Sequence, residues 1–376
     1  MRRISRLDRI RQCGWSTVSP AGYGNGGPGL RITAAAGANP SVAGFSGLAT
    51  CGSVWACPVC AARIATRRAD ELAAVMRYAL AGGCGASLVT LTMRHHEGQG
   101  LKDCWDALAK AWHAVTSGKQ WVGDSDVFGL RGWVKAVEVT RGDNGWHVHL
   151  HALMIWDDPV SIDQARYVGR RMWQRWNRAL ERRGFTSLRD LGGLDVRLAS
   201  LKPGAAGGLH EYFVKLSHEI AGGYAKLARG RGRTPFQILA DGLATGEAGD
   251  LNAWWEWEKA SHGRRQIAWS TGLREWAGMD AEQSDEQVAA EEAGGDDMLF
   301  IEPASWRELR QDPDAVCDLL EAAEDGGYAA AMPWLRKRGL GYMIAKWISR
   351  KPLGKLRLAK AADVSRETSP RRGRRA

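Results

Sequence analysis

The chain has 376 residues, of which 44% are hydrophobic and 25% are charged, and its formal net charge is +10 at pH 7. This composition is typical of globular proteins and excludes a disordered chain. No apolar run reaches the roughly 20 residues that cross a bilayer, and the N-terminus lacks the apolar region of a secretory signal. We therefore expect a cytoplasmic protein without a membrane partner, and the positive charge favours a polyanionic partner.

Four of the seven cysteines lie in residues 1–82, which we expect to form an N-terminal segment. The stretch Cys57-Pro-Val-Cys60 turns tightly enough for two thiolates to reach one ion, and structural zinc requires four such ligands in a tetrahedron. The natural zinc ligands are Cys13, Cys51, Cys57 and Cys60. A redox Cys-x-x-Cys pair is the competing interpretation, but the two additional cysteines favour a structural metal.

Residues 83–230 are expected to form one domain that follows a helix at 61–81. Apolar spacing predicts a strand at 87–92, a helix at 101–116, a hairpin at 133–156, a helix at 161–183, a strand at 194–198 and a helix at 209–220. This order of elements corresponds to a βαββαβ unit. We therefore predict an α+β fold of the ferredoxin-like kind, an antiparallel sheet with helices on one face.

The predicted hairpin carries the clearest chemical signal in the chain. Its second strand places His147, His149 and His151 at alternate positions, so their rings share one face. A turn centred on residues 143–144 pairs Glu138 with His149, whereas a turn centred on 144–145 pairs it with His151. Either register gives a His/His/Glu site for a divalent metal, and the alternative is a polar strand that faces solvent.

The helix at 161–183 is rich in arginine and contains tryptophan. Guanidinium groups bind phosphates and indole rings stack on unpaired bases, which makes this helix a candidate DNA-binding surface. The residues we select are Arg170, Arg171, Trp173, Arg175 and Arg178. For the chain's 18 tryptophans in general, the alternative to DNA contact is packing in the protein core, on the apolar faces of amphipathic helices.

Three further segments follow. Residues 231–278 are expected to form a basic, tryptophan-rich extension, residues 279–300 an acidic linker, and residues 301–376 a small helical module with a basic tail.

Tyr212 and Lys215 lie three positions apart on the predicted helix at 209–220 and so share a face. A tyrosine hydroxyl is a weak nucleophile until a neighbouring cation favours its ionised form, which Lys215 can do. Without a metal site nearby, the pair would be ordinary packing beside a solvated lysine.

The chain resembles the rolling-circle plasmid replication initiators of the HUH endonuclease class, in particular the Rep proteins of actinobacterial plasmids. The resemblance covers about residues 10–278. Its motifs are Ser87-Leu-Val-Thr-Leu-Thr92, Gly145-Trp-His-Val-His-Leu-His-Ala-Leu153, Tyr212-Phe-Val-Lys215, the cysteines at 51–60, Arg233-Thr-Pro-Phe-Gln-Ile-Leu239 and Trp269-Ser-Thr-Gly-Leu273.

The resemblance implies that Tyr212 attacks a phosphodiester at the double-strand origin, forming a 5′-phosphotyrosine link and a free 3′-OH primer. It implies Mg²⁺ or Mn²⁺ on His149 and His151, with Glu138 as third ligand and His147 as a possible replacement. Plasmid origin DNA, a host helicase and a polymerase are the implied partners. A relaxase or transposase of the same class, or a non-catalytic zinc-dependent DNA-binding protein, is the alternative.

Two departures from the family pattern concern the tyrosine region. Some relatives place a glutamate four residues before the tyrosine, where this chain has Gly208, and Glu211 or Glu219 could substitute for it. Tyr224 is the chief rival nucleophile and Tyr342 a more distant one.

Overall fold

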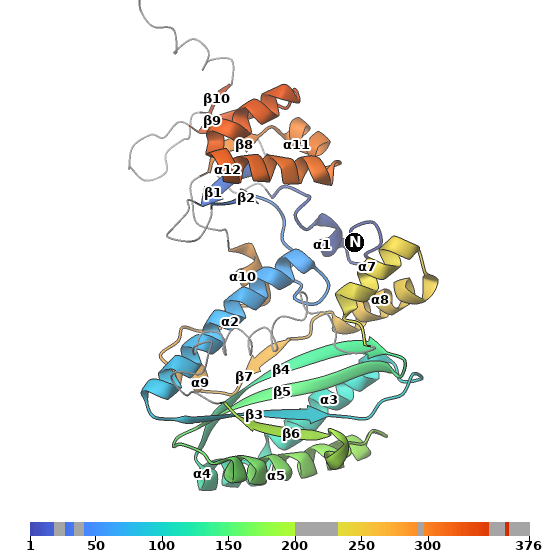
Figure 1. Ribbon diagram of the computed structural model, residues 1–376, viewed down its shortest axis with the longest axis vertical. Coiled ribbons are helices and arrows are strands. Elements are labelled where there is room, and N and C mark those ends of the chain that lie inside the picture. The colour runs from blue at the N-terminus through green and yellow to red at the C-terminus, as the bar shows by residue number, and fades with distance from the viewer. Residues whose placement is uncertain (19–26, 34–40, 200–231, 292–296, 346–357, 361–376) are drawn as a thin grey trace, which may run out of the picture. The chain divides into compact units, whose positions relative to one another are not determined.

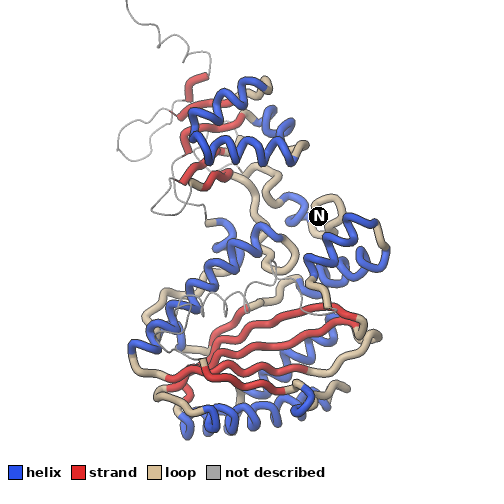
Figure 2. The backbone as a smooth tube through the Cα atoms, in the orientation of Figure 1, coloured by secondary structure: helices blue, strands red, loops and turns tan. Residues whose placement is uncertain are grey.

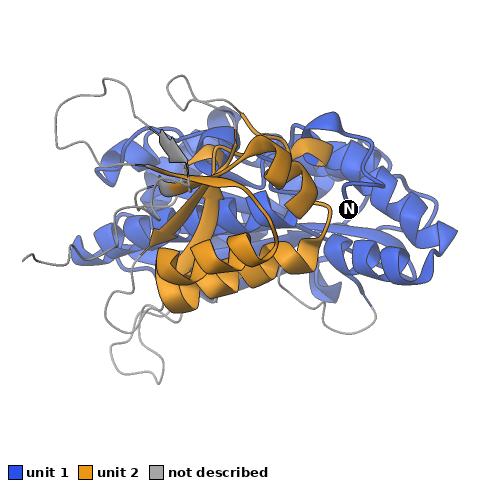
Figure 3. Cartoon of the chain, turned by 90° about the horizontal axis from the view of Figure 1, so that it is seen from above, with its two compact units in different colours: residues 1–10, 52–289 blue, residues 11–51, 290–376 orange. Residues whose placement is uncertain are grey.

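A computed structural model describes residues 1–18, 27–33, 41–199, 232–291, 297–345 and 358–360. The protein is α+β, with helices and two five-stranded antiparallel sheets (Figure 2), in agreement with the predicted class. The chain divides into two compact units, coloured separately in Figure 3. Unit 1 contains residues 1–10 and 52–289, and unit 2 contains residues 11–51 and 290–376.

The sheet of unit 1 has the strand order β6-β3-β5-β4-β7. The strands are β3 (Gly85–Thr92), β4 (Leu130–Gly142), β5 (Gly145–Trp156), β6 (Leu194–Leu198) and β7 (Ile267–Trp269). The helices around it include α2 (Pro58–Ala81), α3 (Leu101–Val115), α4 (Gly118–Phe128) and α5 (Ile162–Glu181). The predicted strand–helix–strand–strand–helix–strand order is present, with α4 as an additional helix.

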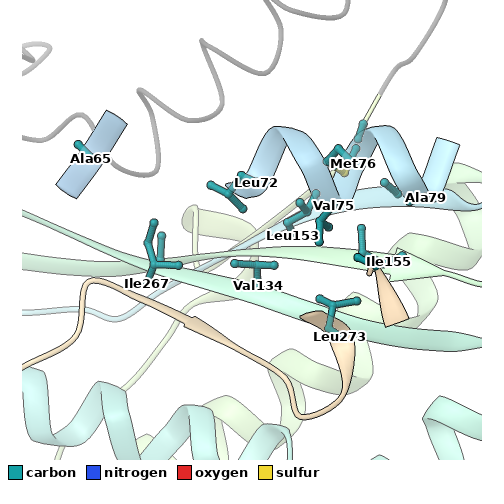
Figure 4. Close-up of a cluster of buried hydrophobic side chains, with 14 residues drawn as sticks. Ala65, Leu72, Val75, Met76, Ala79, Val134, Leu153, Ile155, Ile267 and Leu273 are labelled. Carbon is teal, nitrogen blue, oxygen red and sulfur yellow. The ribbon is translucent and has the colours of Figure 1, made fainter. Parts of the chain in front are cut away.

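Helices cover both faces of this sheet (Figure 1). The two helices of the predicted βαββαβ unit, α3 and α5, pack against one face, and α2, which precedes that unit, packs against the other. On one face, Leu72, Val75 and Met76 of α2 pack against Leu153 and Ile155 of β5 (Figure 4). The other face packs against α3 and α5. The C-terminal half of β5 explains why α2 is needed on the second face, because residues 152–156 are all buried and a strand that is apolar on both sides needs cover on both.

The segment predicted as an extension supplies part of this sheet. It contains α7 (Pro235–Thr245), α8 (Ala248–Ser261), β7 and α9 (Leu273–Trp276). Strand β7 pairs with β4, matching Trp269 to Val134 and Ile267 to Ala136. The described part of the predicted extension, residues 232–278, is therefore an integral part of unit 1. The predicted linker at 279–300 contains the helix α10 (Asp285–Ala290).

Unit 2 has the strand order β10-β9-β8-β1-β2. Its strands are β1 (Gly29–Thr33), β2 (Val42–Ser46), β8 (Asp297–Ile301), β9 (Tyr342–Ala345) and β10 (Leu358–Lys360), and its helices are α11 (Pro303–Leu309) and α12 (Pro313–Lys337). A short helix, α1 (Asp8–Gln12), crosses the boundary at residue 10. The core gathers Leu30, Leu299, Trp306, Leu319 and Leu335. The predicted C-terminal helical module is thus wrong, because its helices pack on a sheet that includes two N-terminal strands.

Among the described residues, no helix combines the length and the apolar character needed to span a membrane.

Candidate metal centre

The β4–β5 hairpin sets the register of the candidate site. Gly142 pairs with Gly145, which leaves Asp143 and Asn144 as a two-residue turn, and Glu138 consequently pairs with His149. Gly145 has a φ of 83°, a left-handed conformation that glycine adopts without strain. Of the two registers predicted, the turn centred on residues 143–144 is the one observed.

Glu138, His149 and His151 form a compact group of potential ligands. The Nε2 atoms of both histidines lie 3.3 Å from Oε2 of Glu138. One ligand atom from each residue lies within 4.8 Å of the others. The three side chains are 14–18% exposed, so they are neither sealed in the core nor fully solvated.

This group fits a divalent cation on the chemistry of its donors. Two imidazole nitrogens and one carboxylate oxygen converge, and three protein ligands leave coordination positions for water or substrate. A structural zinc site would instead have a closed shell of four ligands. The residues present could therefore hold a catalytic metal such as Mg²⁺ or Mn²⁺, with one carboxylate as the hard ligand.

Thr90 orients one of these ligands and was missed by sequence reasoning. Strand β3 pairs Thr90 with His151, and the Thr90 hydroxyl lies 2.9 Å from Nδ1 of His151. A hydrogen bond at one ring nitrogen fixes the orientation of the ring and directs the other nitrogen toward a metal. The sequence predicts the strand at 87–92, but only the pairing of β3 with β5 places Thr90 beside His151.

His147 stands apart from this group and has a different partner. Its Nδ1 lies 2.9 Å from Nε2 of His95, whose Nδ1 lies 2.8 Å from the carbonyl oxygen of Asn144. Since a carbonyl only accepts, neutral His95 donates through Nδ1 and accepts from His147 through Nε2. Burial, together with His149 and His95, lowers the pKa of His147 from 6.5 to about 4. His147 is therefore a neutral neighbour of the Glu138/His149/His151 group, and His95 is a second residue that sequence reasoning missed.

The predicted nucleophile region lies outside the described residues. This applies to Tyr212 and Lys215, to the rival Tyr224, and to Gly208, Glu211 and Glu219. Tyr342 is described, and it is 2% exposed in the core of unit 2, with Arg336 at 5.8 Å from its ring. A packed tyrosine in this position does not present its hydroxyl to DNA.

The five predicted DNA-binding residues differ in their surroundings. Arg175 is 8% exposed and bonds Asp124 at 2.6 Å, and Arg171 bonds the same carboxylate at 2.8 Å. Trp173 donates through Nε1 to Ser187 at 3.0 Å. Arg170 and Arg178 are exposed. Asp124 thus holds Arg171 and Arg175 in an ion-pair network, and the prediction of DNA contact rests mainly on Arg170 and Arg178.

Several tryptophans form a buried cluster rather than a surface for bases. Trp55 contacts Trp105 and Trp257 edge to face, at centroid distances of 4.9 and 5.5 Å. Trp146, at the start of β5, stacks on Trp257 and donates to Glu256 at 2.8 Å. The core interpretation is correct for these residues, and the cluster anchors the histidine-bearing end of β5 to α8.

The four predicted zinc ligands lie together. Cys13, Cys51, Cys57 and Cys60 are all buried, and their sulfur atoms lie within 4.8 Å of one another. Four thiolates at this spacing are the ligand set of a closed, tetrahedral zinc site.

Comparison with known proteins gives the family. The family model described as "Replication protein" matches residues 48–311. The chain is 30% identical over 330 residues to "Protein rep" of Streptomyces lividans, a match that covers 70% of each chain. It is 34% identical over 134 residues to "Neomycin resistance protein" of Streptomyces cyanogenus, which covers 29% of this chain and 31% of that protein. No solved structure matches. The chain therefore belongs to the replication protein family, the plasmid replication initiators.

Proposed function

We propose that the chain initiates rolling-circle replication by nicking one strand of plasmid origin DNA in a metal-dependent reaction with a tyrosine nucleophile. The observation that carries this proposal is the convergence of Glu138, His149 and His151 on one face of the sheet. Family membership supports origin DNA as the partner. The βαββαβ order of unit 1 is consistent with the HUH endonuclease fold.

The reaction is a transesterification. The Tyr212 hydroxyl loses its proton and its oxygen bonds to the scissile phosphorus, while the bond from phosphorus to the 3′ oxygen breaks. The products are a 5′-phosphotyrosine and a 3′-OH that can prime synthesis, and the reverse reaction rejoins the strand. One phosphoester bond replaces another, so no external energy source is needed.

Each residue has a separate part in this scheme. Glu138, His149 and His151 would hold Mg²⁺ or Mn²⁺, which neutralises charge on the scissile phosphate. Thr90 holds the His151 ring in place, and His147 stays uncharged at neutral pH because its pKa is about 4. Lys215 stabilises the ionised form of Tyr212 or contacts the phosphate.

The four-cysteine cluster would bind structural zinc, which gives the two metal sites different roles. Its four ligands form a closed shell, whereas the Glu138/His149/His151 group has three. This contrast favours a nicking enzyme over a DNA-binding protein in which the histidines bind structural zinc. A host helicase and polymerase complete the proposed set of partners.

A covalent-adduct experiment tests the nucleophile. Purified protein with Mn²⁺ and a single-stranded oligonucleotide of the origin should give a protein–DNA adduct that survives denaturant and gel electrophoresis. Tyr212→Phe should abolish the adduct, and Tyr224→Phe should retain it. An adduct that persists in Tyr212→Phe and disappears in Tyr224→Phe would transfer the role to Tyr224.

A second experiment tests the metal group. His149→Ala should stop cleavage while binding of the origin oligonucleotide and the melting temperature stay near those of the wild type, because the His149 side chain is partly exposed and does not belong to the apolar core. Cleavage that continues at the wild-type rate would exclude His149 as a ligand.

A further inference from the structure

A cavity lies at the β7 edge of the unit 1 sheet, away from the metal group. Its volume is 680 Å³, and α3, α4, β4 and β7 supply its walls. Trp133 and Lys135 line it from odd-numbered positions of β4, whereas Glu138 occupies an even-numbered position of the same strand. Because strand side chains alternate, these two residues lie on the sheet face opposite to the metal group.

Indole rings form much of the wall. The indoles on this side of the sheet are those of Trp112, Trp121 and Trp133. The rings of Trp112 and Trp133 meet edge to face at 4.9 Å, and Trp121 and Trp133 keep part of their surface exposed. The cavity has the volume of a small-molecule site, and exposed indole faces favour a flat aromatic ring.

Two donors around the cavity lack an acceptor. The Nε1 group of Trp112 is buried without a hydrogen-bond acceptor, and no carboxylate in the described part of the chain lies within 4.0 Å of the Lys135 ammonium. Burial lowers the pKa of Lys135, which reflects the cost of burying this charge without an anion beside it. Unsatisfied buried donors are rare in native proteins, so a ligand with acceptor oxygens would fit here.

We propose that this cavity binds one nucleotide, with its base against the indole rings and its phosphate at Lys135. A nucleotide combines a flat ring with anionic oxygens, as the walls require. Arg131 also lines the cavity but bonds Asp157 at 2.6 Å, which leaves Lys135 as the cation for the phosphate. An unpaired residue of a DNA strand and a free nucleotide share this chemistry. The site uses none of the nicking residues, so it does not depend on the proposed function.

Binding measurements on the whole chain test this site with two probes, deoxythymidine triphosphate and a 12-nucleotide oligodeoxythymidylate. Lys135→Met should weaken binding of at least one probe about tenfold, as expected for loss of a charge-assisted hydrogen bond. For the oligonucleotide, the slope of log affinity against log salt should become shallower by roughly 0.7, the change for one phosphate contact on a single strand. Lys119→Met is the matched control, since Lys119 is exposed on α4 outside the cavity and should leave binding unchanged.

The outcomes separate the two sources of the nucleotide. Loss of triphosphate binding identifies a free nucleotide, and loss of oligonucleotide binding alone identifies a DNA strand. Unchanged binding of both probes in a Lys135→Met protein of wild-type melting temperature would overturn the proposal. Should that variant not fold, Trp121→Leu decides in the same way, because it removes one wall at a partly exposed position. An oligonucleotide without bases that binds as tightly as the normal one would also overturn it.

Discussion

Thr90 determines which nitrogen of His151 faces Glu138. The Thr90 hydroxyl lies 2.9 Å from Nδ1 of His151, so Nε2 of the same ring is directed to Oε2 of Glu138, at 3.3 Å. Thr92 lies two positions further along β3 on the same face, opposite His149, and no hydrogen bond of its hydroxyl to a histidine is present in the described part of the chain. These two threonines therefore allow the contribution of one hydrogen bond to be isolated.

We expect Thr90→Val to weaken Mn²⁺ binding about tenfold, the usual effect of removing a hydrogen bond that orients a ligand. Titration calorimetry with Mn²⁺ measures the change, and Thr92→Val is the control because it makes the same chemical change on the same face. Equal effects of the two substitutions would show that Thr90 acts only through packing.

The lowered pKa of His147 predicts a loss of stability in acid. Between pH 6.5 and about 4, the unfolded chain binds a proton on this ring that the folded chain excludes. The free energy of unfolding should therefore fall as the pH drops from 7 to 4.5, by at most about 3 kcal/mol from this residue. In urea titrations with EDTA, His147→Gln should show a smaller fall than the wild type. An equal fall of the unfolding free energy in both proteins would contradict a lowered pKa at His147.

At the level of elements, the β4–β5 hairpin could be predicted from sequence because every signal for it is local. The two-residue turn, the alternation of histidines and the position of Glu138 all lie within residues 138–151. Thr90 and His95 could not be found in the same way, because they reach the histidines only through the pairing of β3 with β5. The pairing of β7 with β4 was missed for the same reason.

The turn makes a second prediction possible. A Cβ atom at Gly145 would lie 3.0 Å from Cα of Glu97, in addition to the strain of a φ of 83°. Gly118 has a φ of 77° but open space around its Cβ position. We expect Gly145→Ala to cost about 2–3 kcal/mol of unfolding free energy and Gly118→Ala about 1 kcal/mol. Urea denaturation of both variants measures the difference, and equal costs would show that the contact with Glu97 is easily relieved.

For the whole molecule, the fold class and the local helices and strands could be predicted from the sequence. The sheet of unit 2, which joins strands from both ends of the chain, could not. Strand β1 pairs with β8, and Gly29 faces Phe300 across the ladder. No local pattern connects positions so far apart, and short strands such as β1 and β9 carry weak signals. The local patterns therefore predict the helices of residues 301–376 as a module of their own.

The metal content of the whole chain can also be predicted. We expect elemental mass spectrometry to find one zinc per chain. The double variant Cys57→Ser/Cys60→Ser should contain no zinc and should melt at a lower temperature than the wild type. Cys317→Ser is the control, because Cys317 is exposed and outside the cluster. A wild-type protein that folds equally well without zinc would contradict the structural role.

The pairing of β1 with β8 also has a consequence during synthesis on the ribosome. Strand β1 emerges roughly 270 residues before β8, which at about 5–20 residues per second is a delay on the order of 14–54 s. Throughout that interval the outer edge of β1 has unpaired backbone groups, and such edges associate with other strands. A nascent chain released shortly before β8 would therefore contain most of unit 1 together with a strand edge whose backbone groups are unpaired. Premature termination at that stage should yield fragments that are prone to aggregate.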